Sequence, residues 1–345
     1  MKLCKWIAIA TLVLSQSAQA TILWAGGEEG DFSGGTLCLE ASNGIWRGGY
    51  ARGALYNCGS GIGKSVAFSG GTITSGWLSS QVRFWGIPTS TKLFGFGKLG
   101  TDDGIFVGIA SSNQYKVAIW KVDGGSWTEL ASAAAASFSN GPIFKIDMQV
   151  INYGSSGTVN VYINASANPV LTYTGNISTA ATSNLNGVFA VGPNNNSSGM
   201  SEIIASDADT RLLSLASLTP NAAGDTNQWT GAYTDIDETT VNDTDLINTA
   251  TSGNVFQCNL SALPTGSWQV HGIKITARGT TVGGGISSIA LGVKTNGSSH
   301  TQTPVSQSAV WSPFETSVYT TNPITSGAWT ATEINALQIH IQSAP

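Results

Sequence analysis

KIDMQVINYGSSGTVNVYINASANPVLTYTG, from Lys145 to Gly175, is the stretch of sequence that decides the fold class. Apolar residues occupy every second position in its first two runs, which a Gly- and Ser-rich turn separates: Ile146, Met148, Val150, Val159, Val161 and Ile163. A period of two places alternate side chains on opposite faces of a strand, so each run predicts a strand with one buried face. A third run, Val170–Thr174, completes a predicted three-stranded antiparallel meander.

The composition of the 345-residue chain favours short strands and tight turns throughout. Only 10% of the residues are charged, 41% are hydrophobic and 42 are Gly. Gly supplies the backbone conformations of tight turns, and the scarcity of Glu, Lys and Arg disfavours a helical fold. The net charge is −5, which excludes a nucleic-acid partner because such proteins need a basic face. We therefore expect an all-β chain, long enough for two domains.

The N-terminal segment Met1–Ala20 has the features of an export signal. Lys2 and Lys5 give a positive start, Trp6–Leu14 is apolar, and a small-x-small motif ends at Ala20. The apolar run is too short to span a bilayer. We expect export to the extracellular space or a particle surface, without membrane contact after cleavage. The alternative is that the segment is retained as a hydrophobic anchor.

Strand and turn patterns divide the rest of the chain into two regions. Over 21–205, strand-like runs recur about every ten residues between turn signals, as in β-sandwiches. The clearest hairpin is Gln114–Leu130, whose turn contains Gly124. Over 206–345, a smaller set of short strands is expected, with a helical turn where Thr330 and Glu333 have capping-box spacing and a closing strand over Gln338–Gln342. The expected fold is two antiparallel β-sandwich domains of the jelly-roll type.

The two strand-like runs after the first turn of the quoted stretch carry a family resemblance. Gly157–Asn164, GTVNVYIN, and Leu171–Gly175, LTYTG, resemble strands in the back sheet of the concanavalin A-like, laminin-G-like jelly roll. The resemblance implies that the first domain is concanavalin A-like. Asn164-Ala165 stands where that family usually has Asp-Gly, a change that keeps the chemistry of a turn.

Four further stretches resemble bacteriophage tail or virion-surface structural proteins. These stretches are Ile22–Phe32, Ser201–Asp225, Trp229–Asp245 and Thr321–Asn335. The resemblance implies a non-enzymatic structural or adhesive protein that works within a larger assembly. Such phage proteins normally lack an export signal, so a virion component and an exported relative both stay open.

Enzymatic activity is the third reading of the sequence, after a structural or adhesive protein and a secreted carbohydrate-binding lectin. Glycoside hydrolases of this fold need two carboxylates about 5–10 Å apart. The pattern Glu-x-Asp-x-x-Glu is absent, and Asp147 has no carboxylate two or four residues away along its strand. The acidic residues of the first domain mostly lie in turn-like contexts, which predicts solvated carboxylates. His271, His300 and His340 lie outside any catalytic motif, so we predict no catalytic residue.

Two candidate ligand sites follow from residue chemistry. The chain has 11 Trp residues, and Trp stacks on sugar faces, which makes Trp46 beside Arg47 a candidate glycan contact. The densest acidic cluster is a candidate Ca²⁺ site, although its spacing is not that of an EF-hand: Asp235, Asp237, Asp243 and Asp245. The alternative is that these Asp residues form turns. No other cofactor is predicted.

Two cysteines are candidates for a covalent cross-link. Cys38 and Cys58 are candidates for a disulfide in an oxidising compartment, which would add about 3 kcal/mol of stability. The alternative is that they and Cys258 are small buried apolar residues.

Few Lys residues protect the predicted strand edges. We therefore expect a homo-oligomer or a place in a larger particle or filament.

Overall fold

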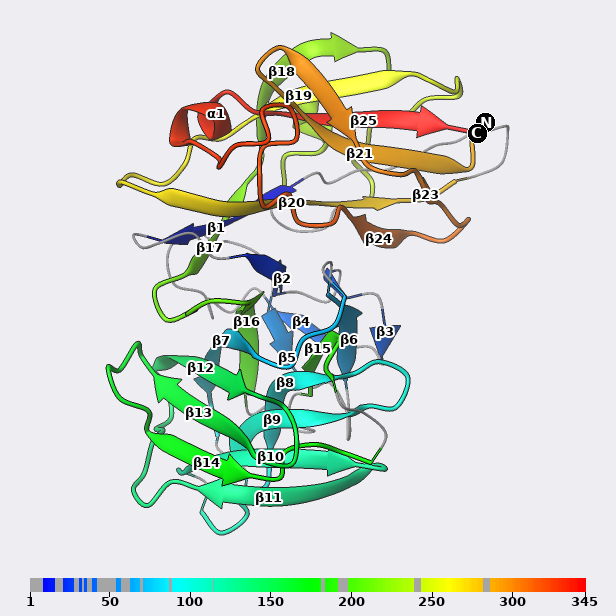
Figure 1. Ribbon diagram of the computed structural model, residues 1–345. Helices are drawn as coiled ribbons and strands as arrows, with labels where there is room; N and C mark the ends of the chain where they lie inside the picture. Colours follow the sequence, from blue (N-terminus) through cyan, green and yellow to red (C-terminus); the bar gives the residue numbers. More distant parts are fainter. Residues whose placement is uncertain are drawn as a thin grey trace. The chain divides into compact units, whose positions relative to one another are not determined.

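The structure is a computed structural model. It describes residues 9–15, 21–27, 31–32, 34–35, 39–41, 54–56, 63–68, 71–86, 89–113, 115–180, 184–191, 198–238, 243–281 and 286–345. The chain divides into two compact units (Figure 1). The first sandwich comprises Ala20–Gly48 and Gly53–Ser214, and the second comprises Met1–Gln19, Gly49–Arg52 and Leu215–Pro345.

One sheet of the first sandwich has seven strands in the order β11-β10-β9-β8-β15-β6-β3, and all its pairs are antiparallel. Its strands are β3 (Gly34–Gly35), β6 (Lys64–Ala67), β8 (Lys92–Lys98), β9 (Asp103–Ile109), β10 (Val117–Asp123), β11 (Ser126–Ser132) and β15 (Gly187–Ala190). The predicted hairpin is β10 and β11, in which Asp123 pairs with Ser126. Gly124 and Gly125 form its turn with φ of 57° and 78°, a conformation that favours glycine.

The other sheet has the order β14-β13-β12-β7-β16-β5-β4, and β2 also pairs with β16. Its strands are β2 (Ile22–Gly26), β4 (Leu39–Ala41), β5 (Ala54–Tyr56), β7 (Gly76–Phe84), β12 (Ile143–Ile151), β13 (Gly157–Ile163), β14 (Leu171–Gly175) and β16 (Ser198–Ser206). The predicted meander is confirmed, because β12 pairs with β13 and β13 pairs with β14, both antiparallel.

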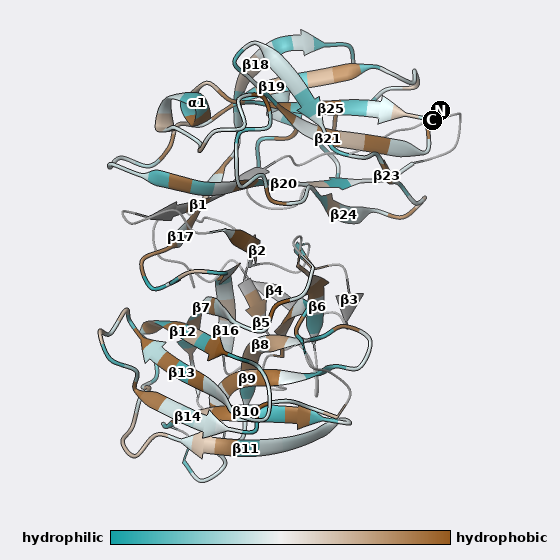
Figure 2. Ribbon diagram, in the orientation of Figure 1, coloured by the Kyte–Doolittle hydropathy of each residue, from teal (hydrophilic) through white to brown (hydrophobic). Residues whose placement is uncertain are grey.

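The core of the first sandwich lies between these two sheets. A single apolar cluster takes Val117 and Ile119 from the seven-stranded sheet and Met148 and Val159 from the other. Apolar and polar stretches alternate along β12 and β13 in Figure 2, as the period of two predicts. The inward residues Ile146, Met148 and Val150 of β12 are at most 1% exposed. Alternation in the sequence therefore sets which face of each strand is buried.

The second sandwich is also built from two sheets. A four-stranded sheet has the order β17-β1-β20-β24, and a second sheet has the order β18-β19-β25-β21-β22, with β23 paired to β21. The strands are β1 (Ile9–Ser15), β17 (Ser214–Leu218), β18 (Pro220–Asn227), β19 (Val255–Leu260), β20 (Gln269–Gly279), β21 (Ser288–Thr295), β22 (Ser298–Thr301), β23 (Val305–Ser306), β24 (Ser312–Glu315) and β25 (Gln338–Ala344). Their shared core includes Ile273, Phe314, Phe256 and Ile339. The expected all-β fold of two antiparallel sandwiches is confirmed.

The described helical structure is short. A 3-10 turn, η2, covers Tyr233–Asp235, and one α-helix, α1, covers Ala331–Asn335. The predicted capping box is confirmed, because the Glu333 backbone N–H donates to the Thr330 side chain while the Glu333 carboxylate accepts from the Thr330 backbone N–H. In the described part of the chain, no helix combines the length and apolar composition needed to cross a bilayer.

Ala165 occupies a backbone conformation that suits glycine better. The turn after β13 places Asn164 and Ala165 at φ of 54° and 57°, and the Ser166 N–H donates to the Ile163 carbonyl. We expect Ala165→Gly to raise the free energy of unfolding by about 0.5–1 kcal/mol, because glycine relieves the left-handed strain. Ala135→Gly is the control, since Ala135 is exposed in a connection and should lose a few tenths of a kcal/mol. Urea unfolding measures both; equal destabilisation by the two variants would contradict the strain.

Candidate functional site

Several residues predicted from the sequence lie outside the described residues. Trp46 and Arg47, the candidate glycan contact, are among them, and so are Cys38 and Cys58, the candidate disulfide. Both sites stay predictions. Cys258 is buried in the second sandwich as a free thiol. Burial raises the pKa of the Cys258 thiol to about 12, so it stays protonated at neutral pH.

Two residues of the acidic cluster bond to protein groups. Asp235 Oδ2 accepts a hydrogen bond from the Ala232 N–H at 2.9 Å, closing a turn. Asp243 forms an ion pair with Arg278, with 3.3 Å between Oδ1 and Nε. Asp237 and Asp245 are half-buried nearby in sequence. Within the described ranges, no group of three or more His, Cys, Asp or Glu side chains is placed to hold a metal ion, so the Ca²⁺ site stays a prediction.

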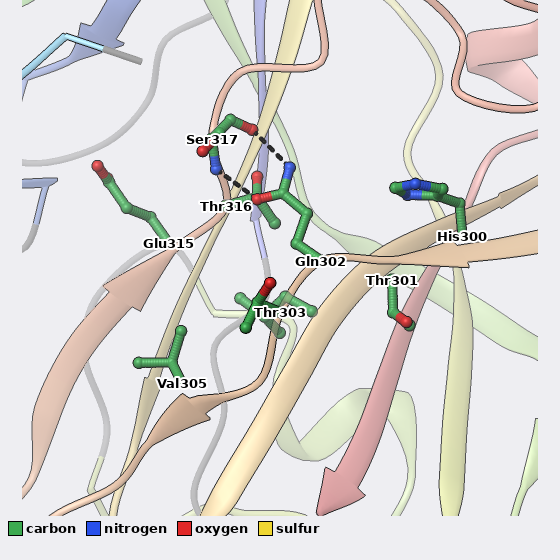
Figure 3. A pocket seen from close by; sticks show the side chains of 9 residues that line it. His300, Thr301, Gln302, Thr303, Val305, Glu315, Thr316 and Ser317 are labelled. Carbon is green, nitrogen blue, oxygen red and sulfur yellow. Dashed lines mark hydrogen bonds between the residues drawn. The ribbon is translucent and has the colours of Figure 1, made fainter. Parts of the chain in front are cut away.

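A polar pocket in the second sandwich is the strongest candidate site (Figure 3). It has a volume of about 560 Å³ and is lined by residues of β21, β22, β23 and β24 and of the segments that follow β22 and β24. The lining residues are Leu291, His300, Thr301, Gln302, Thr303, Val305, Glu315, Thr316 and Ser317. This volume lies within the range of small-molecule sites, about 300–1,000 Å³.

Hydrogen bonds fix part of the pocket wall. The Gln302 side-chain amide donates to the Ser317 carbonyl at 3.1 Å, and the Ser317 N–H donates to Gln302 Oε1 at 2.7 Å, as Figure 3 shows. Thr316 Oγ1 accepts from the Ile275 N–H on β20 at 3.0 Å. These bonds join the segments after β22 and β24 to each other and to the sheet. The wall is therefore preorganised, which lowers the entropic cost of binding a ligand.

Glu315 is the one carboxylate among the described residues that line the pocket. Its Oε2 lies 2.6 Å from Lys274 Nζ, and Lys274 is 1% exposed on β20. The paired ammonium balances the carboxylate charge and limits its movement. Glycosidic hydrolysis requires a second carboxylate across the bond. The described lining supplies one such carboxylate, Glu315.

His300 and two threonines supply polar atoms without partners in the described structure. His300 Nδ1 is buried and makes no hydrogen bond, and its ring lies edge-on to the Tyr319 ring with centroids 5.6 Å apart. The hydroxyls of Thr301 and Thr303 also make no hydrogen bond to another described side chain or backbone group. Burial raises the pKa of Tyr319 to about 12, so its hydroxyl stays protonated at neutral pH. A ligand with hydroxyl groups would find both donors and acceptors here.

Sequence reasoning missed this pocket. In the sequence, His300 lies outside any catalytic motif. The available signal was the run of polar residues from Ser298 to Thr303, SSHTQT, interrupted by no apolar residue. Such a run is also typical of an exposed edge strand. Only the fold brings it next to Glu315 and Ser317.

The first sandwich contains a buried ionic group that the sequence did not indicate. Asp147 is fully buried on β12, and Thr210 Oγ1 donates to its Oδ1 at 2.7 Å. Burial raises the pKa of the Asp147 carboxyl, and nearby Lys145 opposes that shift. The expectation of solvated carboxylates in the first domain is therefore wrong for Asp147. It is also wrong for Asp103, which is 1% exposed and accepts from the Gly124 N–H.

A cation lies against two tryptophans of the first sandwich. Lys92 Nζ is 4.2 Å from the Trp120 ring centroid and 5.1 Å from that of Trp127. Burial lowers the pKa of Lys92, and the Glu129 carboxylate opposes this shift. Trp120 is only 5% exposed, and its Nε1 donates to the Ile109 carbonyl. This ring therefore packs within the domain and does not present a face to a sugar.

The fold and the pocket together define a β-sandwich protein with a hydrogen-bonded polar pocket. The chain matches no protein-family model and no curated protein. Among solved structures, a carbohydrate-binding module from Bacillus subtilis, CBM66, is similar at 8% identity, with a TM-score of 0.33 over 49% of this chain and 92% of that chain.

Two further solved structures are similar to parts of the chain. Domain 4 of an extracellular arabinanase from Geobacillus stearothermophilus matches at 13% identity, covering 55% of this chain and 94% of that chain, with a TM-score of 0.32. A heptameric SAP-like pentraxin from Limulus polyphemus matches at 9% identity, covering 59% of this chain and 79% of that chain, with a TM-score of 0.31. With TM-scores below 0.5, these similarities assign neither a family nor a function to this chain.

Proposed function

We propose that this chain is a non-enzymatic adhesive surface protein that binds a neutral glycan in the pocket of the second sandwich. The observation that carries the proposal is the pocket lining, in which a fixed amide, unpartnered threonine hydroxyls and a charge-balanced carboxylate surround a space of about 560 Å³. The role continues the expectation of an adhesive or lectin-like protein.

The chemistry of the lining favours a glycan over other small ligands. Each sugar hydroxyl both donates and accepts hydrogen bonds, and the lining offers acceptors on Glu315 and groups of both kinds on Thr301 and Thr303. The Lys274 ammonium balances the Glu315 charge, so neither an anion nor a cation is favoured. Leu291 and Val305 add apolar contact for the ring carbons. The volume accommodates one or two sugar rings.

Self-association is part of the same proposal. Strand β14 lies at the edge of its sheet, and its sequence, LTYTG, contains neither a charged residue nor Pro. Unpaired backbone groups on such an edge favour pairing with another strand. We propose that copies associate through this edge, at the outside of a cell or of a phage-like particle. Multiple copies would increase the avidity of weak glycan binding.

Glycan binding is testable with the intact chain. A glycan array should identify a neutral oligosaccharide ligand, whose Kd is then measured by calorimetry. Thr301→Val and Thr303→Val remove hydroxyls from the lining without changing side-chain volume. Each should weaken binding about tenfold, the effect of losing one hydrogen bond to a ligand.

Ser298→Ala is the matched control for these variants. Ser298 lies on the same strand, β22, is exposed and is not part of the lining. Its Kd should equal that of the wild type. If no glycan on the array binds, glycan adhesion is excluded; if all variants bind equally, the pocket is not the site.

A further inference from the structure

The N-terminal apolar segment forms an interior strand of the second sandwich. Strand β1, Ile9–Ser15, lies between β17 and β20 in the four-stranded sheet. It is antiparallel to β20, with pairs from Ile9 opposite Thr276 to Ser15 opposite Gln269. One irregularity interrupts the register, after Val13. Val13 itself is 1% exposed.

Strand β1 is the only sheet neighbour of β17 in the described structure. Ala216 and Leu218 of β17 belong to the apolar core of the second sandwich. Without β1, a row of backbone N–H and C=O groups on both β17 and β20 would lose its partners. The position of β17, and with it part of the core, therefore depends on the N-terminal segment.

The same segment was expected to be an export signal that is removed at Ala20. An export signal and an interior strand make similar demands on sequence, because both need a short run of Ile, Val and Leu without charges. Removal of the segment would open a gap with two exposed strand edges. Such a gap binds an extended apolar peptide through backbone pairing.

We propose that the gap between β17 and β20 is a strand-acceptor site and that Ile9–Ser15 of this chain is its occupant in the folded protein. The site selects an extended apolar strand antiparallel to β20. Backbone pairing and burial at Val13 hold the occupant, and a covalent connection to β2 is not required. The proposal is independent of glycan binding, since none of the residues that line the pocket belongs to β1 or β17.

The test cuts the folded chain between β1 and β2. A protease recognition sequence is inserted within residues 16–20 of the full chain, and the purified protein is cleaved under native conditions. We expect the N-terminal fragment to co-elute with the rest of the chain in gel filtration, at one fragment per chain. A fluorescent peptide of the Ile9–Ser15 sequence should then exchange into the site, whereas a peptide of the same composition in scrambled order should not.

Two substitutions in the cleavable chain separate specific pairing from simple adhesion of an apolar peptide. Val13→Asp places a charge at a buried position of β1, so the cut fragment should be released and the melting temperature should fall. Val310→Asp is the control, because Val310 is 73% exposed in the same sandwich, and its fragment should stay bound. The proposal is overturned if the wild-type fragment separates after cleavage, or if the Val13→Asp fragment is retained equally well.

Discussion

Lys145→Met is expected to lower the free energy of unfolding of the first sandwich by about 3 kcal/mol. The Lys145 ammonium on β12 donates to three backbone carbonyls of the segment after β16, those of Thr210 at 2.6 Å, Arg211 at 3.1 Å, and Leu213. Methionine keeps the length and apolar stem of the side chain but removes all three donors. The three carbonyls would then lose their donor, and the buried Asp147 carboxyl would lose the ammonium 3.9 Å away.

The loss can be measured separately from the second sandwich by hydrogen exchange in peptides from β12. Lys98→Met is the matched control, because Lys98 is half-buried at the end of β8 and makes no salt bridge within the described residues. Lys98→Met should change the free energy of unfolding by no more than about 0.5 kcal/mol. Unchanged protection of β12 in Lys145→Met would show that the three carbonyl contacts add no net stability.

The buried Asp147 carboxyl makes the stability of the first sandwich depend on pH. Because burial raises the folded-state pKa of Asp147, the folded protein binds a proton more tightly than the unfolded chain does. The stabilising contribution is complete below the unfolded pKa of about 4 and is lost as pH rises through the folded pKa. Asp147→Asn should therefore gain stability relative to the wild type as pH rises above about 4, and an opposite trend would contradict the raised pKa.

Gly292→Ala is expected to lower the free energy of unfolding by about 2–3 kcal/mol and to disrupt the pocket. A Cβ on Gly292 of β21 would lie 1.9 Å from the His300 carbonyl oxygen and 2.7 Å from the Thr301 Cα. Both are backbone atoms of β22, where Gly292 pairs with Thr301, so neither can rotate away. The strand must move, and it carries two residues of the pocket lining. Glycan binding should weaken by at least tenfold along with the stability.

Gly327→Ala is the control for this substitution. Its Cβ would meet nothing closer than Thr325 Oγ1 at 3.5 Å, an ordinary contact, and its φ is not positive. We expect its free energy of unfolding to change by no more than about 0.5 kcal/mol and its Kd for the glycan to stay unchanged. Thermal unfolding and calorimetric titration measure both variants. A Gly292→Ala protein with wild-type stability and affinity would show that β22 can shift without consequence.

The parts of the fold that depend on neighbouring residues could be predicted from the sequence. The alternation from Ile146 to Ile163 gave the strands β12 and β13 and their buried faces, because the period of two is a property of one strand. The turn at Gly124 and the capping box at Thr330 were predictable for a similar reason. Each depends on the backbone preferences of a few consecutive residues.

The candidate site and the buried contacts depend on which strands meet, and only the tertiary structure decided that. Alternation assigns a residue to a face but names no partner, so neither the Lys145 contacts with Thr210 nor the approach of β22 to Glu315 was visible in the sequence. The N-terminal segment shows most clearly that a sequence pattern does not identify the partner of a strand. An apolar run of this length satisfies both an export signal and an interior strand, and the pairing of β1 with β20, more than 250 residues away, is a property of the folded chain.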